Sequence, residues 1–452
     1  MKTNRWYSFS LFIFFSFVFF YITSKIVFSE KIFSNKFYLI FLLINSIILF
    51  IIYYSFKITK SNYTNFKLLT ISLILSLYII EISYKSAQNY LAGFEKKNKD
   101  ALENIYLDKL KNKENVTLQL SPGMFLDYSD QQNNNFLPLS GISNTQTLMC
   151  NESKNLIQYQ TDRYGFNNNN AIWDEKIIDI LLIGDSYTHG LCVNNEFNIK
   201  GNLELLGSEI NKNLKIMNLG MQGSGPLIEL AIMKEFSKNR KIKNLVWFYY
   251  EGNDLTDLDA EISNENLQRY INPKFTQNLQ NRQSESDLFL KEYLKSRIDN
   301  HLTKKKITLK SIFDKFRYHL KFTKLRLEFS EIFNFKFTNA APKLKNESFE
   351  NFEKIIKITQ KYLSDEKIKF HLVYLPSYYR YKTGDNQLHH YSEVIDIIKQ
   401  NEINLIDMHK ELFVKIDDQL SLFPFRKFGH YTPEGYKLIS EIILRKISLD
   451  AK

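Results

Sequence analysis

The chain has 452 residues, a length that allows two or three domains, and its 60 Lys and Arg exceed its 49 Asp and Glu. Hydrophobic residues make up 44% and charged residues 24%, which excludes a chain that is mainly disordered. With 15 Gly, 8 Pro and 2 Cys, the composition also excludes a collagen-like protein and a disulfide-dense scaffold. The mean hydropathy of −0.29 hides an asymmetry, because the first 84 residues are mostly apolar. A membrane anchor joined to a polar body is therefore predicted.

Three apolar stretches follow one another in this anchor, which we place at residues 1–85: Tyr7–Thr23, Tyr38–Phe56 and Leu68–Ile80. At about 1.5 Å per residue, the first two are long enough to cross a hydrocarbon core roughly 30 Å thick. The third is marginal, because Glu81 falls where the span should end. About three transmembrane helices are expected.

The charges that flank these stretches bear on topology. A cleavable signal peptide is the alternative for the first stretch, but no small-residue cleavage site follows Thr23. The positive-inside rule favours a cytoplasmic N-terminus, since basic residues lie before the first stretch and between the second and third: Lys2, Arg5, Lys57, Lys60 and Lys67. Three crossings then place everything after about residue 85 outside. In a bacterial inner membrane, that side is the periplasm.

Residues 86–150 are polar and irregular, and we interpret them as a connector that docks on the body formed by residues 151–452. In this body, short apolar runs predict buried strands at Ile177–Ile183, Leu214–Leu219, Leu245–Tyr250, Phe370–Leu375 and Asn404–Asp407. Helical spacing predicts helices at Ile228–Phe236, Phe349–Leu363 and Ser392–Lys399. This alternation indicates an α/β fold with a parallel sheet covered on both faces. In such sheets ligands bind beyond the carboxyl ends of the strands.

Four motifs stand beyond predicted strands or before the last helix: Gly184–Gly190 (GDSYTHG), Asn218–Pro226, Tyr250–Asp254 and Gly429–Tyr436. A serine directly after a strand, with glycines on both sides, can expose its hydroxyl at a helix N-terminus. Each motif also has a purely structural interpretation, such as an N-cap serine or a glycine-rich turn. Taken one at a time, these motifs do not establish a site.

Together and in this order, the motifs resemble those of the SGNH/GDSL hydrolase family over roughly residues 160–445. The resemblance implies a flavodoxin-like SGNH hydrolase domain with a five-stranded parallel sheet. It implies Ser186 as nucleophile, His430 as general base and Asp185 as support of the turn. It also implies an oxyanion hole formed by the backbone N–H groups of Ser186 and Gly223 with the side chain of Asn253. A serine hydroxyl needs a neighbouring base, and the oxyanion needs donors already in place.

One departure from the family pattern concerns the base. The family usually has an Asp two or three residues before the catalytic histidine, where this chain has Phe428 and Lys427. We therefore expect a Ser–His dyad in which a backbone carbonyl orients the imidazole. His189 is the rival base by proximity, but three residues after the nucleophile it would lie along the helix rather than over the hydroxyl.

The two cysteines are expected to pair. In an oxidising compartment, Cys150 and Cys192 form a natural disulfide; two buried free thiols are the alternative. Neither has the surroundings of a cysteine nucleophile. The segment Asp162–Asn168 resembles the one that leads into the sheet in membrane-linked members of the family, and we give it a structural role.

A helical basic insertion is expected at about residues 255–345. Within it, Lys291–Arg326 holds twelve Lys and Arg against three acids, a local net charge of +9, with apolar residues at partly helical spacing. A solvated helical hairpin, a basic surface lying on anionic lipid and a lid that gathers an acidic glycan are the three interpretations. The sequence has no zinc motif, P-loop or dinucleotide fingerprint, so no cofactor and no nucleic-acid partner is expected.

These features predict a multi-pass protein of the bacterial inner membrane with its catalytic domain on the periplasmic side. It would be a membrane-anchored serine esterase or O-acyltransferase for acyl esters, most plausibly acetyl esters, of a cell-surface polysaccharide or glycolipid. A transferase would need a separate acyl-donor membrane protein, because three spans are few for carrying a donor across. The alternative is a catalytically degenerate SGNH domain that serves as a glycan-binding or assembly subunit.

Overall fold

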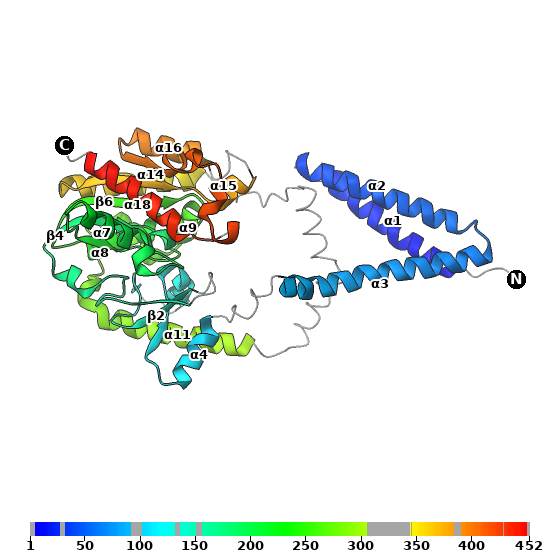
Figure 1. The fold of residues 1–452 in the computed structure, drawn as a ribbon, viewed down its shortest axis with the longest axis horizontal. Helices are drawn as coiled ribbons and strands as arrows, with labels where there is room; N and C mark the ends of the chain where they lie inside the picture. Colours follow the sequence, from blue (N-terminus) through cyan, green and yellow to red (C-terminus); the bar gives the residue numbers. More distant parts are fainter. Residues whose placement is uncertain are drawn as a thin grey trace. The chain divides into compact units, whose positions relative to one another are not determined.

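A computed structural model of the chain describes residues 5–27, 32–91, 102–131, 136–150, 156–304, 344, 346–383, 390–427 and 429–449. The described part divides into two compact units (Figure 1). One contains the described residues up to Leu91, and the other contains those from Leu102 onward.

The described residues of the N-terminal unit form three helices, α1 (Trp6–Val27), α2 (Ile32–Ser55) and α3 (Lys60–Leu91). Two segments are long and apolar enough to cross a membrane, Trp6–Ser24 with 19 residues and Lys60–Glu81 with 22. The third apolar stretch, expected to be marginal, is thus the longer of the two. The helix formed by the second stretch, α2, contributes only the shorter apolar run Leu42–Ser55 among the residues that were searched. The candidate segment that contains the third apolar stretch is long because α3 begins well before that stretch and extends beyond it.

Polar side chains join these three helices. The Asn45 Nδ2 of α2 donates to the Phe15 carbonyl of α1 at 3.0 Å. The hydroxyls of Ser8 and Ser55 lie 2.7 Å apart, and that of Ser8 also lies 3.3 Å from the hydroxyl of Tyr63. A hydrogen bond between apolar helices satisfies groups that a hydrocarbon environment would leave without partners.

The C-terminal unit is built on a five-stranded parallel sheet whose strands run in the order β5-β4-β6-β7-β8. This is the flavodoxin-like order that the family resemblance implies. The strands are β4 (Ile177–Ile183), β5 (Ile216–Asn218), β6 (Lys241–Tyr250), β7 (Lys369–Leu375) and β8 (Asn404–Asp407). All five predicted strands are present; the apolar runs of β4, β6 and β7 are buried on both faces of the sheet, while the edge strand β8 is only partly buried.

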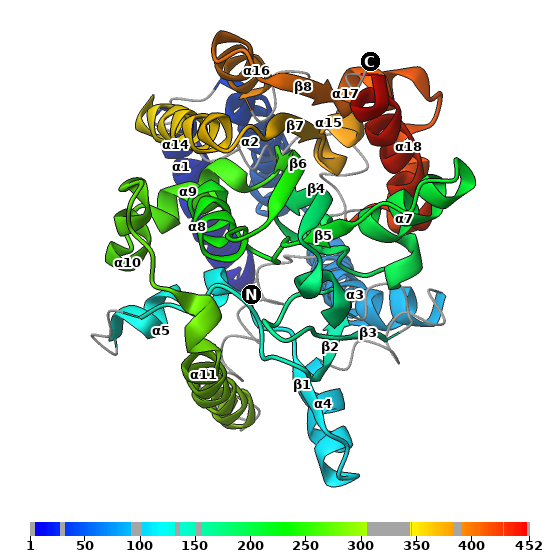
Figure 2. The ribbon, with the colours of Figure 1, turned by 90° about the vertical axis from the view of Figure 1, so that its left-hand side faces the viewer.

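Helices cover the two faces of this sheet (Figure 2). On one face, α7 (Ile199–Glu209) packs against α18 (Pro433–Leu449). On the other face, α8 (Pro226–Phe236), α9 (Asp254–Glu261) and α14 (Asn346–Asp365) pack against one another. Neighbouring strand residues point to opposite faces, so that Leu181 joins one hydrophobic core and Leu182 the other. Three of the four predicted motifs follow the carboxyl ends of β4, β5 and β6, and the fourth leads into α18.

A smaller sheet of three strands was not predicted. It contains β1 (Val116–Leu118), β2 (Gln146–Cys150) and β3 (Ile157–Gln160), with β1 parallel and β3 antiparallel to β2. The strands have three to five residues and mix polar with apolar side chains, which left no periodic signal. The segment interpreted as a connector therefore supplies two strands of a sheet.

The remaining helices occupy connections between these elements. They are α4 (Leu102–Lys111), α5 (Leu126–Gln131), α6 (Ser186–His189), α10 (Glu265–Gln268), α11 (Gln283–Lys304), α15 (Tyr378–Thr383), α16 (Tyr391–Gln400) and α17 (Met408–Glu411). Short 3₁₀ turns complete the unit, among them η1 (Pro122–Met124). Helix α11 lies within residues 255–345, the range predicted as a helical basic insertion. Residues 305–343 lie outside the described residues.

Helix α11 packs on the segment that precedes the body. Arg297 forms an ion pair with Glu103 of α4 at 2.7 Å. The Tyr293 hydroxyl donates to the Met124 carbonyl in η1 at 2.7 Å. The start of the insertion thus contributes to the structure of the C-terminal unit.

Asp162 organises the segment that leads into the sheet. Its fully buried carboxylate accepts hydrogen bonds from the backbone N–H groups of Tyr164 and Phe166, from Asn168 Nδ2 and from Trp173 Nε1, at 2.7–3.0 Å. Asn168 also exchanges two hydrogen bonds with the backbone of Asn218 at the end of β5. These contacts are consistent with the structural role expected for this segment.

Candidate active site

The turn Gly184–Ser186 contains the predicted nucleophile and is called the nucleophile turn below. It follows β4 directly. Gly184 has φ +153°, and a Cβ atom there would lie 2.2 Å from Thr188 Oγ1 and 3.0 Å from Phe248 Cβ. Only glycine therefore fits between strand and helix. Asp185 is the N-cap of α6, and its Oδ1 accepts from the backbone N–H of Tyr187 at 2.9 Å. Ser186 begins the helix with 8% of its surface exposed.

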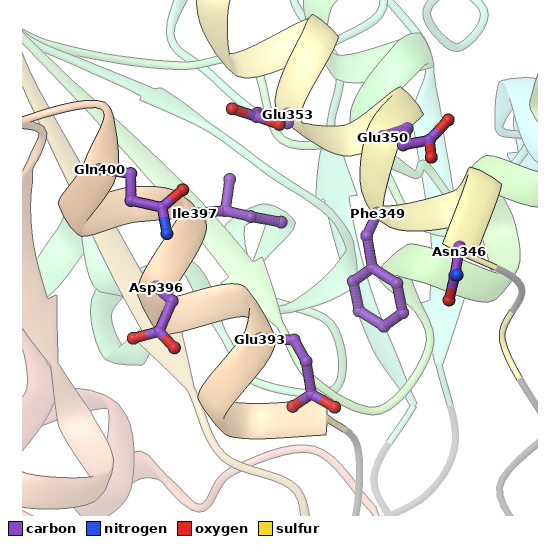
Figure 3. Close-up of a pocket in the computed structure, with 8 residues that line it drawn as sticks. All are labelled: Asn346, Phe349, Glu350, Glu353, Glu393, Asp396, Ile397 and Gln400. Carbon is purple, nitrogen blue, oxygen red and sulfur yellow. The ribbon is translucent and has the colours of Figure 1, made fainter.

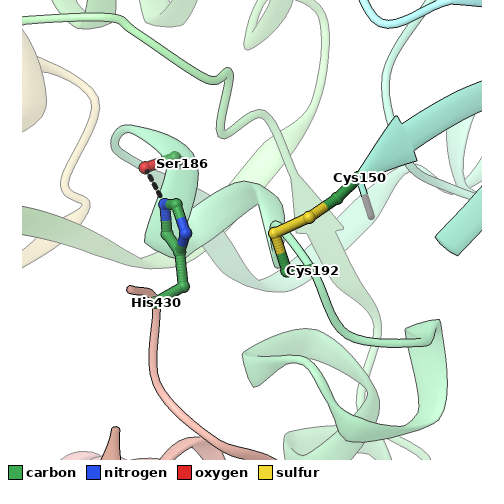
Figure 4. The surroundings of a disulfide bond; sticks show 4 residues. All are labelled: Cys150, Ser186, Cys192 and His430. Carbon is green, nitrogen blue, oxygen red and sulfur yellow. Dashed lines mark hydrogen bonds between the residues drawn. A yellow bond between two sulfur atoms is a disulfide. The ribbon is translucent and has the colours of Figure 1, made fainter. Parts of the chain in front are cut away.

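His430 reaches this serine from the other end of the sequence. Its Nε2 lies 2.9 Å from Ser186 Oγ, as Figure 4 shows. Helix α18 begins three residues later at Pro433, so the histidine stands on the loop that precedes the closing helix. At this distance a neutral imidazole accepts the serine proton, as a general base must.

Aromatic packing supports the loop that carries His430. The Tyr187 ring lies 4.9 Å from the imidazole centre and 4.7 Å from the ring of Tyr431. The Tyr187 hydroxyl donates to the Gly429 carbonyl at 3.4 Å, and that of Tyr431 donates to the Pro376 carbonyl at 2.6 Å. Tyr187, the residue after Ser186, thus links the Ser186 turn to the loop that carries His430, and Tyr431 ties that loop to the segment after β7.

The nearest upstream acid is engaged elsewhere. Asp418 pairs with Arg426 at 2.7 Å. Phe428 lies outside the described residues, and Lys427 brings a cation to the position where the family has its acid.

Asp185, the N-cap of α6, also reaches Ser186. Its Oδ2 lies 3.2 Å from Ser186 Oγ. Burial raises the pKa of Asp185 to about 6, opposed by the Tyr187 N–H, by the charge of His430 and by the Ser186 hydroxyl.

His189, the rival base, faces away from the nucleophile. Its Nε2 lies 3.0 Å from the Tyr159 hydroxyl, which in turn donates to Gln119 Oε1 at 2.5 Å. The side chain is fully buried, and this burial lowers the pKa of His189 to about 3. The geometry favours His430 as the base and gives His189 a place in the packing between α6 and the small sheet.

Gly223 stands in the loop after β5 with φ +65°. This loop is tied to the nucleophile turn, because the Met221 N–H donates to the Gly184 carbonyl at 3.0 Å. Asn218 Nδ2 donates to the Thr188 carbonyl at 2.7 Å. From the other side, a Cβ atom on Gly123 of η1 would lie 2.0 Å from the Gly223 carbonyl oxygen.

Asn253 is the N-cap of α9, directly after β6. Its side chain forms no capping hydrogen bond. Instead, Nδ2 donates to Asp257 Oδ2 at 2.6 Å. Strands β5 and β6 flank β4 in the sheet, so Gly223 and Asn253 follow the two strands beside the one that carries Ser186. All three therefore stand at the carboxyl edge where the motifs were expected to meet.

A buried ion pair at the same edge was not predicted. Arg380 binds the Glu251 carboxylate through Nε at 2.9 and 3.0 Å and through Nη2 at 2.5 Å, and both side chains are at most 1% exposed. The Ser377 N–H and the Tyr374 hydroxyl donate to the same carboxylate. Glu251 stands directly before Gly252-Asn253, and this position in the motif was the available signal for a functional acid. Nothing in the sequence identified Arg380 as its partner.

The predicted disulfide is present. Cys150 and Cys192 are bonded with their Cα atoms 5.1 Å apart (Figure 4). The bond joins the end of β2 to the loop that follows α6, three residues after His189. It therefore restrains the chain close to the nucleophile turn.

A groove of about 350 Å³ lies elsewhere, between α14 and α16 (Figure 3). Phe349 and Ile397 lie between acidic residues of both helices. Two of these acids are already paired, Glu353 with Lys357 at 2.6 Å and Glu393 with His390 at 3.1 Å. None of the predicted site residues lines this groove. Among the described residues, no group of three or more His, Cys, Asp or Glu is placed to hold a metal ion.

Comparisons with known proteins found no matching family model and no matching curated protein. Among solved structures, the chain is similar to a protein described as lipolytic and of the G-D-S-L family from Desulfitobacterium hafniense, with 14% identity, a TM-score of 0.32 and coverage of 60% of this chain and 99% of that one. A lipase/acylhydrolase from Enterococcus faecalis also has 14% identity and a TM-score of 0.32, over 60% and 95% of the two chains. An acetyl xylan esterase has 13% identity and a TM-score of 0.32, over 60% and 100%. The interpretation of the site rests on its own geometry.

Proposed function

We propose that this chain is a membrane-anchored serine esterase or O-acyltransferase that acts on acyl esters. The hydrogen-bonding distance of 2.9 Å between Ser186 Oγ and His430 Nε2, at the carboxyl edge of the sheet, carries the proposal. A serine at a strand-to-helix turn with an imidazole on its hydroxyl is the arrangement that nucleophilic acyl chemistry requires.

In the proposed reaction, Ser186 Oγ attacks the ester carbonyl carbon while His430 Nε2 takes the hydroxyl proton. The carbonyl oxygen becomes an oxyanion, for which the N–H groups of Ser186 and Gly223 and the Asn253 amide are the proposed donors. The C–O bond to the leaving alcohol then breaks, and His430 returns its proton to that alcohol. Water or a sugar hydroxyl next attacks the carbonyl carbon of the acyl-serine while His430 takes its proton. The bond from the acyl carbon to Ser186 Oγ then breaks, and His430 returns the proton to Ser186 Oγ, which releases the acid or the new ester.

A short acyl group suits this site best. Only 8% of the surface of Ser186 is exposed, and the aromatic ring of Tyr187 packs beside the imidazole at 4.9 Å. On this burial and this ring contact we base the proposal that the acyl group is acetyl rather than a long chain. As the acceptor or alcohol component, we propose a cell-surface polysaccharide or glycolipid. In a transferase, a separate membrane protein would supply the acyl group from the cytoplasmic side.

This proposal predicts that purified full-length protein in detergent cleaves a p-nitrophenyl acetate ester faster than the octanoate ester. With an O-acetylated polysaccharide, free acetate is expected. If the enzyme is a transferase, an added deacetylated oligosaccharide gains 42 Da per acetyl group, seen by mass spectrometry, while free acetate falls. Ser186→Ala is the matched control. Faster cleavage of octanoate would contradict the preference for a short acyl group.

The location of the C-terminal unit follows from the charges around the apolar helices. We propose that the N-terminus is cytoplasmic and that α2, despite its shorter apolar run Leu42–Ser55, crosses the membrane together with α1 and α3, which would place the unit in the periplasm of a bacterial inner membrane. The Cys150–Cys192 disulfide supports this side, because disulfides persist in oxidising compartments.

A periplasm-dependent alkaline phosphatase fused after Lys452 is therefore expected to be active, and the same enzyme fused at Lys57, between α2 and α3, to be inactive. A cytoplasm-dependent reporter at the same two positions is the control and should give the opposite pattern. Activity of the phosphatase at Lys57 and not after Lys452 would place the unit in the cytoplasm and remove the polysaccharide substrate.

One observation favours a second candidate function. At the usual position of the supporting acid the chain has Lys427, and loss of such an acid lowers the rate by about 10⁴ in a related triad. A domain that binds a glycan or assembles with other proteins, without catalysis, would need no such acid. Absence of Ser186-dependent ester cleavage, together with retained binding of the polysaccharide, would favour this function.

A further inference from the structure

The N-cap residue of α9 and two residues of the helix follow one another at spacings of four: Asn253, Asp257 and Glu261. Residues four apart lie on the same face of a helix, one turn above the other. Asn253 is one of the proposed oxyanion donors, and the other two side chains are carboxylates. This face therefore extends from the proposed oxyanion hole along the helix.

Asp257 fixes the orientation of the Asn253 amide. Its Oδ2 accepts from Asn253 Nδ2 at 2.6 Å. A carboxylate only accepts hydrogen bonds, so a flipped amide would place two oxygens against each other. The Asn253 Nδ2 group carries two N–H bonds, and with one given to Asp257 the second has a defined direction. Burial raises the pKa of Asp257 to about 6, while the hydrogen bond from Asn253 acts in the opposite direction.

Glu261, one turn further on, holds the loop that contains Gly223. Its carboxylate accepts from the N–H groups of Gly225 at 2.5 Å, Leu227 at 2.9 Å and Ile228 at 3.2 Å. These groups are at the N-terminus of α8, where a helix offers donors without partners of their own. The side chain is 1% exposed.

The loop and the helix also touch directly. A Cβ atom on Gly225 would lie 2.9 Å from Asp257 Cβ and 2.9 Å from Glu261 Oε1. Gly225 is two residues from Gly223, the other loop donor proposed for the oxyanion hole. One face of α9 thus contacts Asn253, which follows β6, and the Gly223 loop, which follows β5.

We propose that Asp257 is a positioning residue that acts through Asn253, and that Glu261 aligns the Gly223 loop with it, so that one helix face sets the geometry of the oxyanion hole. This inference deepens the proposed function and rests on it. Neither carboxylate touches the reacting atoms. Their effect is expected in the transition state, where donors about 3 Å from the oxyanion act most strongly.

The test is a double-mutant cycle in the full-length protein with p-nitrophenyl acetate. Asn253→Ala, which removes one donor, is expected to lower kcat about 10²-fold, and Asp257→Ala about tenfold, with KM little changed in both. In the double variant, kcat should equal that of Asn253→Ala alone, because Asp257 has nothing left to orient. Asp257→Asn keeps an oxygen acceptor and should recover most of the activity. Asp259→Ala, at an exposed position of the same helix, is the matched control.

Two results would overturn this inference while leaving the proposed function intact. One is wild-type kcat in Asp257→Ala; the other is a further tenfold loss when Asp257→Ala is added to Asn253→Ala. If Asp257→Ala fails to fold, Asp257→Ser, whose side chain is too short to reach Asn253 Nδ2, takes its place in the cycle with the same expected tenfold loss, and wild-type kcat in Asp257→Ser would overturn the inference. A wild-type protein without Ser186-dependent turnover would contradict both the proposed function and this inference.

Discussion

Replacing Ser186 or His430 by alanine is expected to lower the turnover of an acetyl ester by about 10⁴-fold or more. The two groups act as a unit, because the serine hydroxyl attacks only as the imidazole takes its proton. Their atoms lie at hydrogen-bonding distance, 2.9 Å apart, in the structure. The measurement is kcat/KM with p-nitrophenyl acetate for each variant and for the double variant, which should be no slower than either single one.

His189→Ala is the informative control for this pair. Its side chain is buried and bonded to Tyr159 rather than to Ser186. We expect this variant to unfold at a lower temperature while its kcat per folded molecule stays within a few-fold of the wild type. Full activity in His430→Ala, with activity lost in His189→Ala at unchanged fold, would reverse the assignment of the base.

Removing the Cys150–Cys192 disulfide is expected to have the largest effect on stability. The two residues are 42 positions apart, and closing a loop of that length stabilises by about 4 kcal/mol in the chain-entropy model. For a domain of this size, that loss lowers the thermal midpoint by roughly 10 °C. The variants are Cys150→Ser, Cys192→Ser and both together, measured by circular dichroism.

The three disulfide variants should unfold at nearly the same temperature, because each removes the same bond. The wild type in reductant is the matched control and should join them. Turnover is expected to fall as well, since Cys192 lies in the loop directly after the nucleophile helix. Labelling of both thiols in the non-reduced folded protein would contradict the account, as would variants as stable as the wild type.

The main sheet could be predicted from the sequence because its strands are short, apolar and buried on both faces. The bounds of β4, Ile177–Ile183, and of β8, Asn404–Asp407, agree with the predicted strands residue for residue. The strand before each motif placed Ser186, Gly223 and Asn253 at one edge. Burial on both faces gives a continuous apolar run, which is the strongest strand signal that a sequence carries.

Features that depend on contacts between distant segments could not be predicted. Strand β1 is a three-residue run that becomes a strand only by pairing with β2, some thirty positions later. The partner of Glu251 is Arg380, 129 residues away, and neither residue type in isolation indicates a buried pair. The role proposed here for Asp257 depends likewise on where Gly225 approaches α9.

The most direct test of the central claim is to identify the residue that a fluorophosphonate probe modifies. Such a probe reacts with an activated serine and leaves a stable adduct. In detergent-solubilised full-length protein, we expect one adduct per chain, mapped by peptide mass spectrometry to Ser186, with none in Ser186→Ala and much slower formation in His430→Ala. An unmodified wild-type protein, or an adduct on any other residue that persists in Ser186→Ala, would contradict the claim that Ser186 and His430 form a catalytic pair.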